Sequence, residues 1–237
     1  MEAYSLISII FNPKSTGASE QNAKQLLDQL RAHRGLAKDI QLLATTHAGH
    51  AEALAYHTAK AHNKPLIISS SGDGGYNEVI NGVMRATAEG AEAITGLLPS
   101  GNANDHYHSL NSGDLEKLIR KRQERVIDLI KVTTHHKDVA WERYAHSYTG
   151  IGLTADASIE YNKISMNRIN ELLASVKAIY NSRRSEVIID NKTHTYDSLV
   201  FSNVNRLGKM FTLSERSKVN DGRFEVIALK SKNKAEL

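Results

Sequence analysis

The residues best suited to do chemistry lie in the segment Ile67–Gly82, which combines glycines with an acid. Its pattern predicts a buried strand, a glycine loop and a helix that carries Val79, Val83 and Met84 at helical spacing. Glycines at such a corner let backbone N–H groups approach an anion at the helix N-terminus. Asp73 stands in the middle of the loop, and a carboxylate beside phosphates is expected mainly where a divalent metal lies between them. Because Asp-Gly and Gly-Gly are also ordinary turn dipeptides, this loop alone favours a plain turn.

Two further loops rich in small polar residues follow other strand-like segments. Asn12–Gly17 comes after the first such segment, and Ser19 is a candidate N-cap for the next helix. Pro99–Asp105 comes after the fourth. In open parallel sheets, ligands bind in the crevice beyond the carboxyl ends of the strands, where all three loops are expected. Each loop alone could be a turn or a cap, but three at one edge, one of them with an acid, indicate a site for phosphate and a metal.

Strands and helices alternate in the first half of the chain. The strand-like segments are Tyr4–Phe11, Ile40–Thr45, Pro65–Ser70 and Ala93–Leu98. The helical patterns are Ser19–His33, His50–His62, Tyr76–Ala88 and Gly113–Arg122. This order of short apolar strands and helices predicts an α/β domain, with a parallel sheet in a three-layer arrangement.

The pattern changes after Arg125, where strands follow one another without alternating helices. The predicted strands are Val126–Val132, Arg143–Leu153, Ser185–Ile189, Tyr196–Asn203 and Arg223–Leu229. One helix, near Met166–Tyr180, interrupts them. Consecutive strands of this kind predict a mostly antiparallel, sandwich-like second layer. We therefore predict two domains, residues 1–124 and 125–237.

The composition excludes several classes of protein. The 237 residues are 41% hydrophobic and 24% charged, as in soluble globular proteins, and no apolar run approaches the ~20 residues of a membrane span. The N-terminus lacks the basic region of a signal peptide. There is no cysteine, which excludes disulfides and suits a cytoplasmic protein. A net charge of +4 is compatible with anionic substrates or an anionic membrane surface and too small to indicate nucleic acid.

Histidines are numerous and could suggest zinc. Among the eleven, the closest groups are His47/His50, His106/His108 and His135/His136. No cysteine accompanies them and no paired ligand motif is present, so we interpret them as solvated or loop histidines.

The three loop motifs, in this order and spacing, resemble the catalytic domain of the diacylglycerol kinase superfamily. That superfamily includes bacterial lipid kinases and sphingosine kinases and is more distantly related to NAD kinase. Thr45–Ala51 resembles its threonine-glycine nucleotide loop, Gly150–Gly152 the strand that opens its second domain, and Val219–Val226 its acidic Asp-Gly motif. The resemblance covers nearly the whole chain and implies a kinase with an α/β nucleotide domain and a β-sandwich.

The resemblance also implies roles for individual residues. Asp73 would act on the ATP phosphates through Mg²⁺, Asp105 would be a second acid at the cleft, and Glu78 would brace the loop. The residues that would line or hold the nucleotide are Asn12, Lys14, Ser15, Thr16, Thr45, Ser71, Gly72, Gly74, Gly75, Asn77 and Asn102. Phosphoryl transfer requires positioning and charge neutralisation more than covalent chemistry, which fits this set.

A structural magnesium site is implied at the Asp-Gly motif. It would combine the carboxylate of Asp221 with the backbone carbonyls of Lys218 and Arg223. A hard cation takes oxygen ligands, and two carbonyls beside a carboxylate supply them.

The chain departs from the family at several positions. The family usually has Gly-Gly-Asp-Gly-Thr, whereas Ser71 replaces the first glycine here and Gly75 the threonine. Sphingosine-type kinases also have forms of this motif that begin with serine. The glycine at position 75, in contrast, removes a hydroxyl group that would contact phosphate or nucleotide. Asn102 replaces another threonine and can still donate a hydrogen bond.

The family's general base, a glutamate well downstream of the Asp-Gly motif, has no counterpart. Only Glu225 and Glu236 follow the aspartate of that motif, and neither fits the position. We therefore interpret the chain as a C-terminally truncated kinase and expect that it transfers phosphate weakly or not at all.

The main hypothesis is ATP- and Mg²⁺-dependent phosphorylation of diacylglycerol to phosphatidic acid by a cytoplasmic protein that contacts the membrane peripherally. One alternative is a sphingoid or other long-chain lipid acceptor, suggested by Ser71. Another is a non-catalytic nucleotide-binding remnant, which fits the replaced threonines and the missing glutamate. The asparagine-proline motif and the Pro99–Asp105 motif disfavour NAD kinase. We expect a lipid partner and no nucleic acid, and an unfinished sheet edge would permit a homodimer.

Overall fold

A computed structural model describes residues 4–15, 17–33, 35–110, 113–136, 139–152, 184–207, 211–212 and 218–230. The chain divides into two compact units. The first contains residues 1–146 and 206–212, and the second contains residues 147–205 and 213–237.

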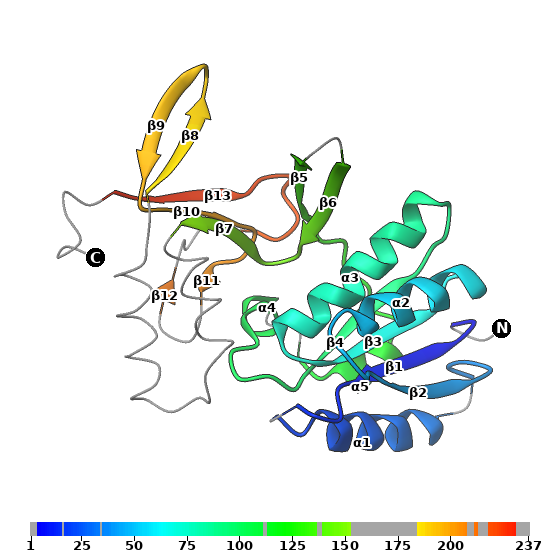
Figure 1. The fold of residues 1–237 in the computed structure, drawn as a ribbon. Helices are drawn as coiled ribbons and strands as arrows, with labels where there is room; N and C mark the ends of the chain where they lie inside the picture. Colours follow the sequence, from blue (N-terminus) through cyan, green and yellow to red (C-terminus); the bar gives the residue numbers. More distant parts are fainter. Residues whose placement is uncertain are drawn as a thin grey trace. The chain divides into compact units, whose positions relative to one another are not determined.

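A four-stranded parallel sheet forms the centre of the first unit (Figure 1). Its strands, in spatial order, are β2 (Ile40–Ala44), β1 (Ile7–Phe11), β3 (Leu66–Ser71) and β4 (Ile94–Pro99). Ile7 of β1 pairs with Ile40 on one side and Leu66 on the other. Every residue of β1 is buried, which is typical of a strand covered on both faces. The predicted parallel sheet is confirmed.

Helices cover both faces of this sheet. One face holds α1 (Ser19–Arg31) and α5 (Leu115–Arg120), and the other holds α2 (His50–Ala61) and α3 (Asp73–Ala88) (Figure 1). Successive strand residues point to opposite faces, so Ile9 packs with Leu30 against the α1 side while Ile10 packs with Val79 against the α3 side. The predicted three-layer arrangement is confirmed.

Two helical features differ from the sequence-based prediction. Helix α3 begins at Asp73, one turn before the predicted Tyr76, and the short helix α4 (Asp105–Leu110) was not predicted. Gly74 and Gly75 are poor helix formers, so the local pattern places the helix start too late. Asp73 is therefore the first residue of a helix and not the middle of a loop.

The first unit extends beyond the predicted boundary at residue 124 because a hairpin packs on α3. Its strands are β5 (Ile130–His136) and β6 (Val139–Ala145). The Asn81 side chain of α3 donates to the Tyr144 carbonyl at 2.8 Å and accepts from the Tyr144 N–H at 2.9 Å. Arg143 also forms an ion pair with Glu52 of α2. These contacts join the hairpin to the helical layer, and the compact unit ends at His146. The short strands β11 (Arg206–Leu207) and β12 (Phe211–Thr212) pair with each other and also belong to this unit.

The second unit is antiparallel, as predicted. Strands β7 (Tyr148–Gly152), β10 (Ser198–Ser202) and β13 (Glu225–Leu229) form a sheet in the order β13-β10-β7. The predicted single strand Arg143–Leu153 is thus two strands, β6 and β7, separated at the buried pair His146 and Ser147.

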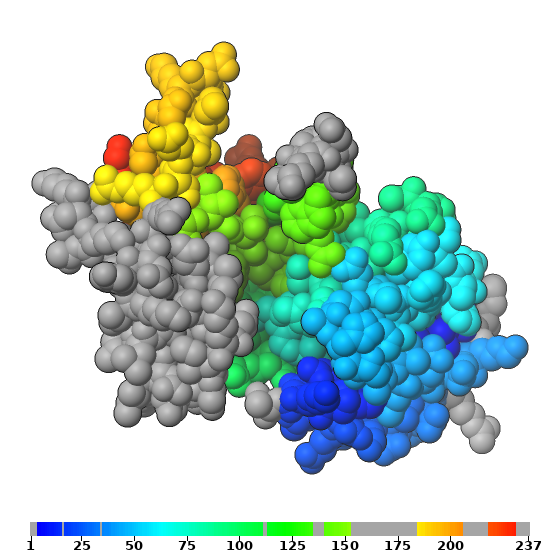
Figure 2. Space-filling view, in the orientation of Figure 1, coloured from blue at the N-terminus to red at the C-terminus, as the bar shows by residue number. Residues whose placement is uncertain are grey.

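A second hairpin stands out from that sheet within the same unit (Figure 2, yellow). It consists of β8 (Ser185–Ile189) and β9 (Lys192–Tyr196). Asp190 and Asn191 form its turn with φ of 50° and 63°, the positive values that a tight two-residue turn requires. The predicted helix Met166–Tyr180 lies outside the described residues. Within the described ranges, no helix is long and apolar enough to cross a membrane.

Candidate functional site

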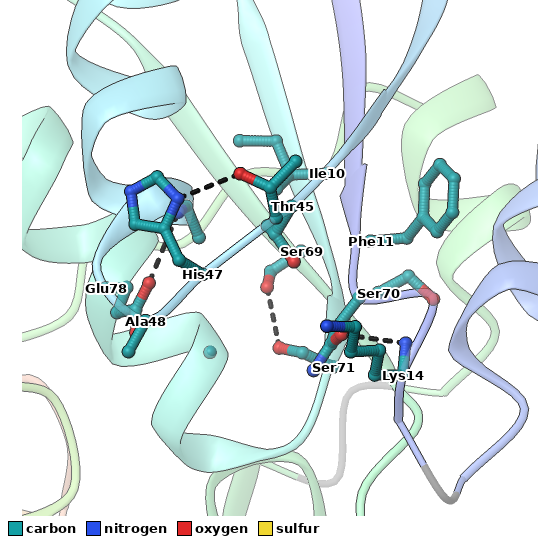
Figure 3. A pocket seen from close by; sticks show the side chains of 14 residues that line it. Ile10, Phe11, Lys14, Thr45, His47, Ala48, Ser69, Ser70, Ser71 and Glu78 are labelled. Carbon is teal, nitrogen blue, oxygen red and sulfur yellow. Dashed lines mark hydrogen bonds between the residues drawn. The ribbon is translucent and has the colours of Figure 1, made fainter.

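A pocket of about 390 Å³ opens at the carboxyl ends of β1, β2 and β3 (Figure 3). Its volume falls within the range of about 300–1,000 Å³ that is typical of small-molecule sites. Five of the residues predicted to contact a nucleotide line it: Asn12, Lys14, Thr45, Ser71 and Gly75. The strand ends thus bring together residues that are as far as 63 positions apart in the sequence (from 12 to 75).

The loop after β1 is anchored through Ser19. The Ser19 hydroxyl accepts from the Asn12 N–H at 3.0 Å and donates to the carbonyl of Ser70 at the end of β3. The predicted N-cap role of Ser19 is wrong, because the N-cap is Ala18, with φ of 56°, and Ser19 is the first helical residue. The Asn12 side chain accepts from the Lys14 N–H at 2.9 Å, which fixes the turn that places both residues on the pocket wall.

The rest of this loop lies against the loop after β4. The Ser15 hydroxyl faces the Ser100 carbonyl at 3.5 Å, and a Cβ built on Gly17 would lie 2.0 Å from that same oxygen. Glycine is therefore required at 17 by close backbone approach. Ser15 is not among the pocket-lining residues, and Thr16 lies outside the described residues.

The loop after β2 is braced by Glu78 of α3. Its two carboxylate oxygens accept from the N–H groups of Gly49 at 3.0 Å and Ala51 at 3.2 Å. These N–H groups stand at the start of α2, where a negative charge also complements the helix dipole. Glu78 therefore fixes the loop that presents Thr45 to the pocket.

The carboxylate of Asp73 holds the beginning of α4. Oδ2 accepts from the Asp105 N–H and Oδ1 from the His106 N–H, both at 3.0 Å. Both donors are N–H groups of the first helical turn, which have no partner within the helix. Asp73 thus joins the starts of α3 and α4, and neither it nor Asp105 is among the residues that line the pocket.

The loop after β4 is shaped by Asn104, which the sequence analysis did not single out as a site residue. Its side chain accepts from the Gly101 N–H at 3.0 Å and donates to the Gly101 carbonyl at 2.8 Å. A Cβ on Gly101 would lie 2.4 Å from the Cα of Gly72, so the two loops touch backbone to backbone. The signal for Asn104 is its residue type, since asparagine readily adopts the left-handed conformation found here, with φ of 51°. The remaining predicted residues, which also lie outside the pocket lining, are Gly72, Gly74, Asn77 and Asn102.

Two histidines are buried beneath Asp73. The rings of His106 and His146 meet edge to face with centroids 4.5 Å apart, and both lie against Tyr76 at 5.4 and 5.0 Å. Burial and the neighbouring His146 lower the pKa of His106 from 6.5 to about 3, and burial also lowers the pKa of His146. The interpretation of His106 as a solvated or loop histidine is therefore wrong. His146, which the sequence analysis missed, lies with Nε2 3.1 Å from the Asp73 carbonyl oxygen.

The implied magnesium site at the Asp-Gly motif is an exposed turn of the second unit. Asp221 Oδ1 accepts from the Arg223 N–H at 3.1 Å, and Gly222 has φ of 71°. In the described part of the chain, no group of three His, Cys, Asp or Glu side chains is placed to hold a metal. A carboxylate with carbonyls still suits a hard cation, so binding here would depend on the carbonyls of Lys218 and Arg223.

The fold and the pocket define an open-sheet α/β protein with a ligand site at the carboxyl ends of its strands. The family model of the diacylglycerol kinase catalytic domain matches residues 7–132, which is more than half of the chain. The chain belongs to this family and is a kinase.

Individual relatives agree with this assignment. A diacylglycerol kinase of Bacillus subtilis (strain 168) is 28% identical over 237 residues, covering 96% of this chain and 75% of the relative. A relative from Staphylococcus aureus (strain MRSA252) is 25% identical over 154 residues, or 61% of this chain and 47% of its own length. The crystal structure of a diacylglycerol kinase from Bacillus anthracis str. Sterne superimposes with a TM-score of 0.67 at 19% identity, covering 100% of this chain and 77% of that one. At this identity the structural likeness supports the fold.

Proposed function

We propose that the protein transfers a phosphoryl group from ATP to the hydroxyl of a membrane lipid, and that the lipid is diacylglycerol. The observation that carries the proposal is the pocket at the ends of β1–β3, because it lies within the family match and gathers Asn12, Lys14, Thr45 and Ser71. A lipid substrate resides in a bilayer, so the protein would meet it at the membrane surface.

The pocket has the chemistry that a nucleoside triphosphate needs. Lys14 supplies a positive charge, while Thr45 and Ser71 supply hydroxyl groups. The 16-residue helix α3 begins beside the pocket, and the N-terminus of a helix favours phosphate groups. Phosphoryl transfer depends mainly on such positioning and electrostatic stabilisation.

Magnesium fits the donor set near Asp73. Each Asp73 oxygen accepts one backbone N–H, and an ionised carboxylate has about four acceptor sites, so capacity for a cation is left. Carboxylates that bind metals are commonly held by hydrogen bonds of this kind. We propose that Asp73 acts on the phosphates through Mg²⁺, where the ion neutralises charge, and that Asp105 is a second acid that organises the site. We also propose that Asp221 with the carbonyls of Lys218 and Arg223 holds a second, structural Mg²⁺.

A radiolabelled-ATP assay with mixed micelles tests this proposal. We expect label to appear slowly in phosphatidic acid when the micelles contain diacylglycerol, and no label in micelles without it. Label on sphingosine, with none on diacylglycerol, would replace the acceptor by a sphingoid base. ATP binding without label on any lipid would contradict the kinase reaction and favour the non-catalytic alternative. The rate also tests the sequence-based expectation of weak transfer.

A further inference from the structure

Residues 71 and 75, four positions apart at the β3–α3 corner, share one space. A Cβ built on Gly75 would lie 2.6 Å from the Ser71 Oγ and 2.7 Å from the Ser71 Cβ, separations that real Cβ atoms essentially never show. Beside it, a Cβ on Gly74 would meet nothing within 4 Å. The Ser71 side chain therefore occupies the space that a side chain at position 75 would need. Without a displacement, only one of the two positions can hold a residue larger than glycine.

The Ser71 hydroxyl is oriented by a second hydroxyl below it. Ser71 Oγ and Ser69 Oγ are 2.7 Å apart (Figure 3). Ser71 also donates to the Gly72 carbonyl at 2.9 Å. A serine hydroxyl has one proton, so with the Ser71 proton on Gly72, Ser69 must be the donor in the pair. Ser69 is 1% exposed, which fixes its hydroxyl under Ser71, and both residues line the pocket.

We propose that Ser71 supplies the phosphate-binding hydroxyl that a threonine at 75 would otherwise supply. The two departures from Gly-Gly-Asp-Gly-Thr are then one exchange, in which the hydroxyl has moved from the last position of the motif to the first. When ATP binds, Ser71 turns its O–H from the Gly72 carbonyl to a phosphate oxygen while it continues to accept from Ser69. This inference rests on the proposed function, since it takes the phosphates of ATP as the ligand.

The inference reverses the expectation that Gly75 costs the site a contact. If Ser71 only filled space, its Cβ would be sufficient and its hydroxyl dispensable. Ser71→Ala keeps the Cβ and removes the hydroxyl, so this variant separates the two roles.

The test is a set of variants whose ATP affinity is measured by titration calorimetry with Mg²⁺ and whose folding is measured by thermal unfolding. We expect Ser71→Ala to unfold near the wild-type temperature and to bind ATP about tenfold more weakly, as for one hydrogen bond to a charged group. Gly75→Thr should lower the unfolding temperature because it collides with Ser71. Gly74→Thr is the matched stability control, because the same change one residue earlier meets open space.

The double variant Ser71→Gly/Gly75→Thr decides the question. We expect it to recover the stability lost in Gly75→Thr and to bind ATP within about twofold of wild type, since one hydroxyl returns to the same space. ATP binding by Ser71→Ala at wild-type affinity, or a double variant that binds no better than Ser71→Ala, would overturn the inference alone. A wild-type protein that does not bind ATP would overturn the proposed function and this inference with it.

Discussion

The dipeptide Asp-Gly occurs at two places that were both predicted to meet magnesium, and the structure gives the two very different surroundings. Asp73 begins a 16-residue helix, and its carboxylate binds the N–H groups of Asp105 and His106. Asp221 lies in an exposed turn and accepts from Arg223, two residues further along the chain. The same dipeptide begins a helix at Asp73 and lies in a bend at Asp221, so tertiary structure decides both its conformation and what the carboxylate holds.

The largest expected effect is that of removing the Asp73 carboxylate. Hydrogen bonds to charged groups contribute about 1.5–3 kcal/mol each, so Asp73→Ala should lower the free energy of unfolding by about 3 kcal/mol or more. Asp73→Asn should also be destabilising, because its NH₂ group would face a backbone N–H. Urea unfolding measures both variants, and wild-type stability in Asp73→Ala would contradict the role of Asp73 in holding α4.

This prediction also changes how Asp73 should be used to probe ATP binding. A loss of ATP binding in Asp73→Asn could follow from a displaced α4 as well as from a lost metal contact. The unfolding measurement on the same variant separates these two causes, because only the first lowers stability without ATP.

Acid should weaken the structure around the buried His106 and His146. His106 and His146 have lowered pKa values in the folded protein, so at pH below about 6.5 the unfolded chain binds more protons than the folded one. Stability is therefore fully present above about pH 6.5 and falls as the pH approaches 3. For His106 alone the loss should reach about 1.4 kcal/mol at pH 5.5, and His146 acts in the same direction.

Urea unfolding at pH 7.5 and pH 5.5 measures this loss. His106→Phe, which fills a similar space without titrating, should flatten the pH dependence, whereas His62→Gln, at an exposed position, should leave it unchanged. An equal pH dependence in His106→Phe and wild type would show that His106 does not cause the loss.

Removing the Glu78 carboxylate should have an effect on stability between those of the two aspartates. Glu78 accepts from two N–H groups, but the loop that carries them is largely exposed. Glu78→Gln removes the charge and one acceptor, and we expect a loss of about 1 kcal/mol of unfolding free energy. Glu89→Gln is the matched control at the other end of α3, where an exposed pairing with Tyr56 and Lys60 should contribute little. Equal losses in the two variants would argue against a bracing role for Glu78.

The smallest expected effect is that of Asp221→Ala without magnesium, where an exposed turn residue should change stability by no more than about 0.5 kcal/mol. With Mg²⁺ added, wild type should gain thermal stability and Asp221→Ala should gain less, because two carbonyls alone bind a hard cation poorly. Glu186→Ala, at an exposed position of the same unit, is the control. The same response to Mg²⁺ in Asp221→Ala and the control would contradict a metal site here.

Much of the fold could be predicted because its signals are local. The central strand Ile7–Phe11 is apolar except for Ser8, and the leucines of α1 recur at helical spacing, so the parallel sheet and its covering follow from the sequence. The sequence analysis missed the hairpin turn at Asp190 and Asn191, because the positive φ values of these residues have no counterpart in a hydrophobic pattern. It also missed the early start of α3, because the glycines of the first helical turn carry no apolar side chain that would mark the helical period.

The sequence predicted which loops form the site, but it did not predict which residues contact one another there. Strand ends identify where Asn12, Thr45 and Ser71 meet. The partner of Asp73 lies more than thirty residues away, in the helix α4 that has no periodic signal, and the burial of His106 depends on His146 from the β5–β6 region. Such contacts exist only once the elements have packed, so the sequence names the residues without showing what each one holds.

The central claim is that ATP binds at the carboxyl ends of β1, β2 and β3. Hydrogen–deuterium exchange with and without ATP and Mg²⁺ tests it most directly, because it locates binding without altering a residue. The account predicts slower exchange in the pocket loops, residues 12–15, 45–48 and 69–75, and unchanged exchange in the β8–β9 hairpin. Unchanged exchange in all three loops at saturating ATP, or protection confined to other segments, would contradict it.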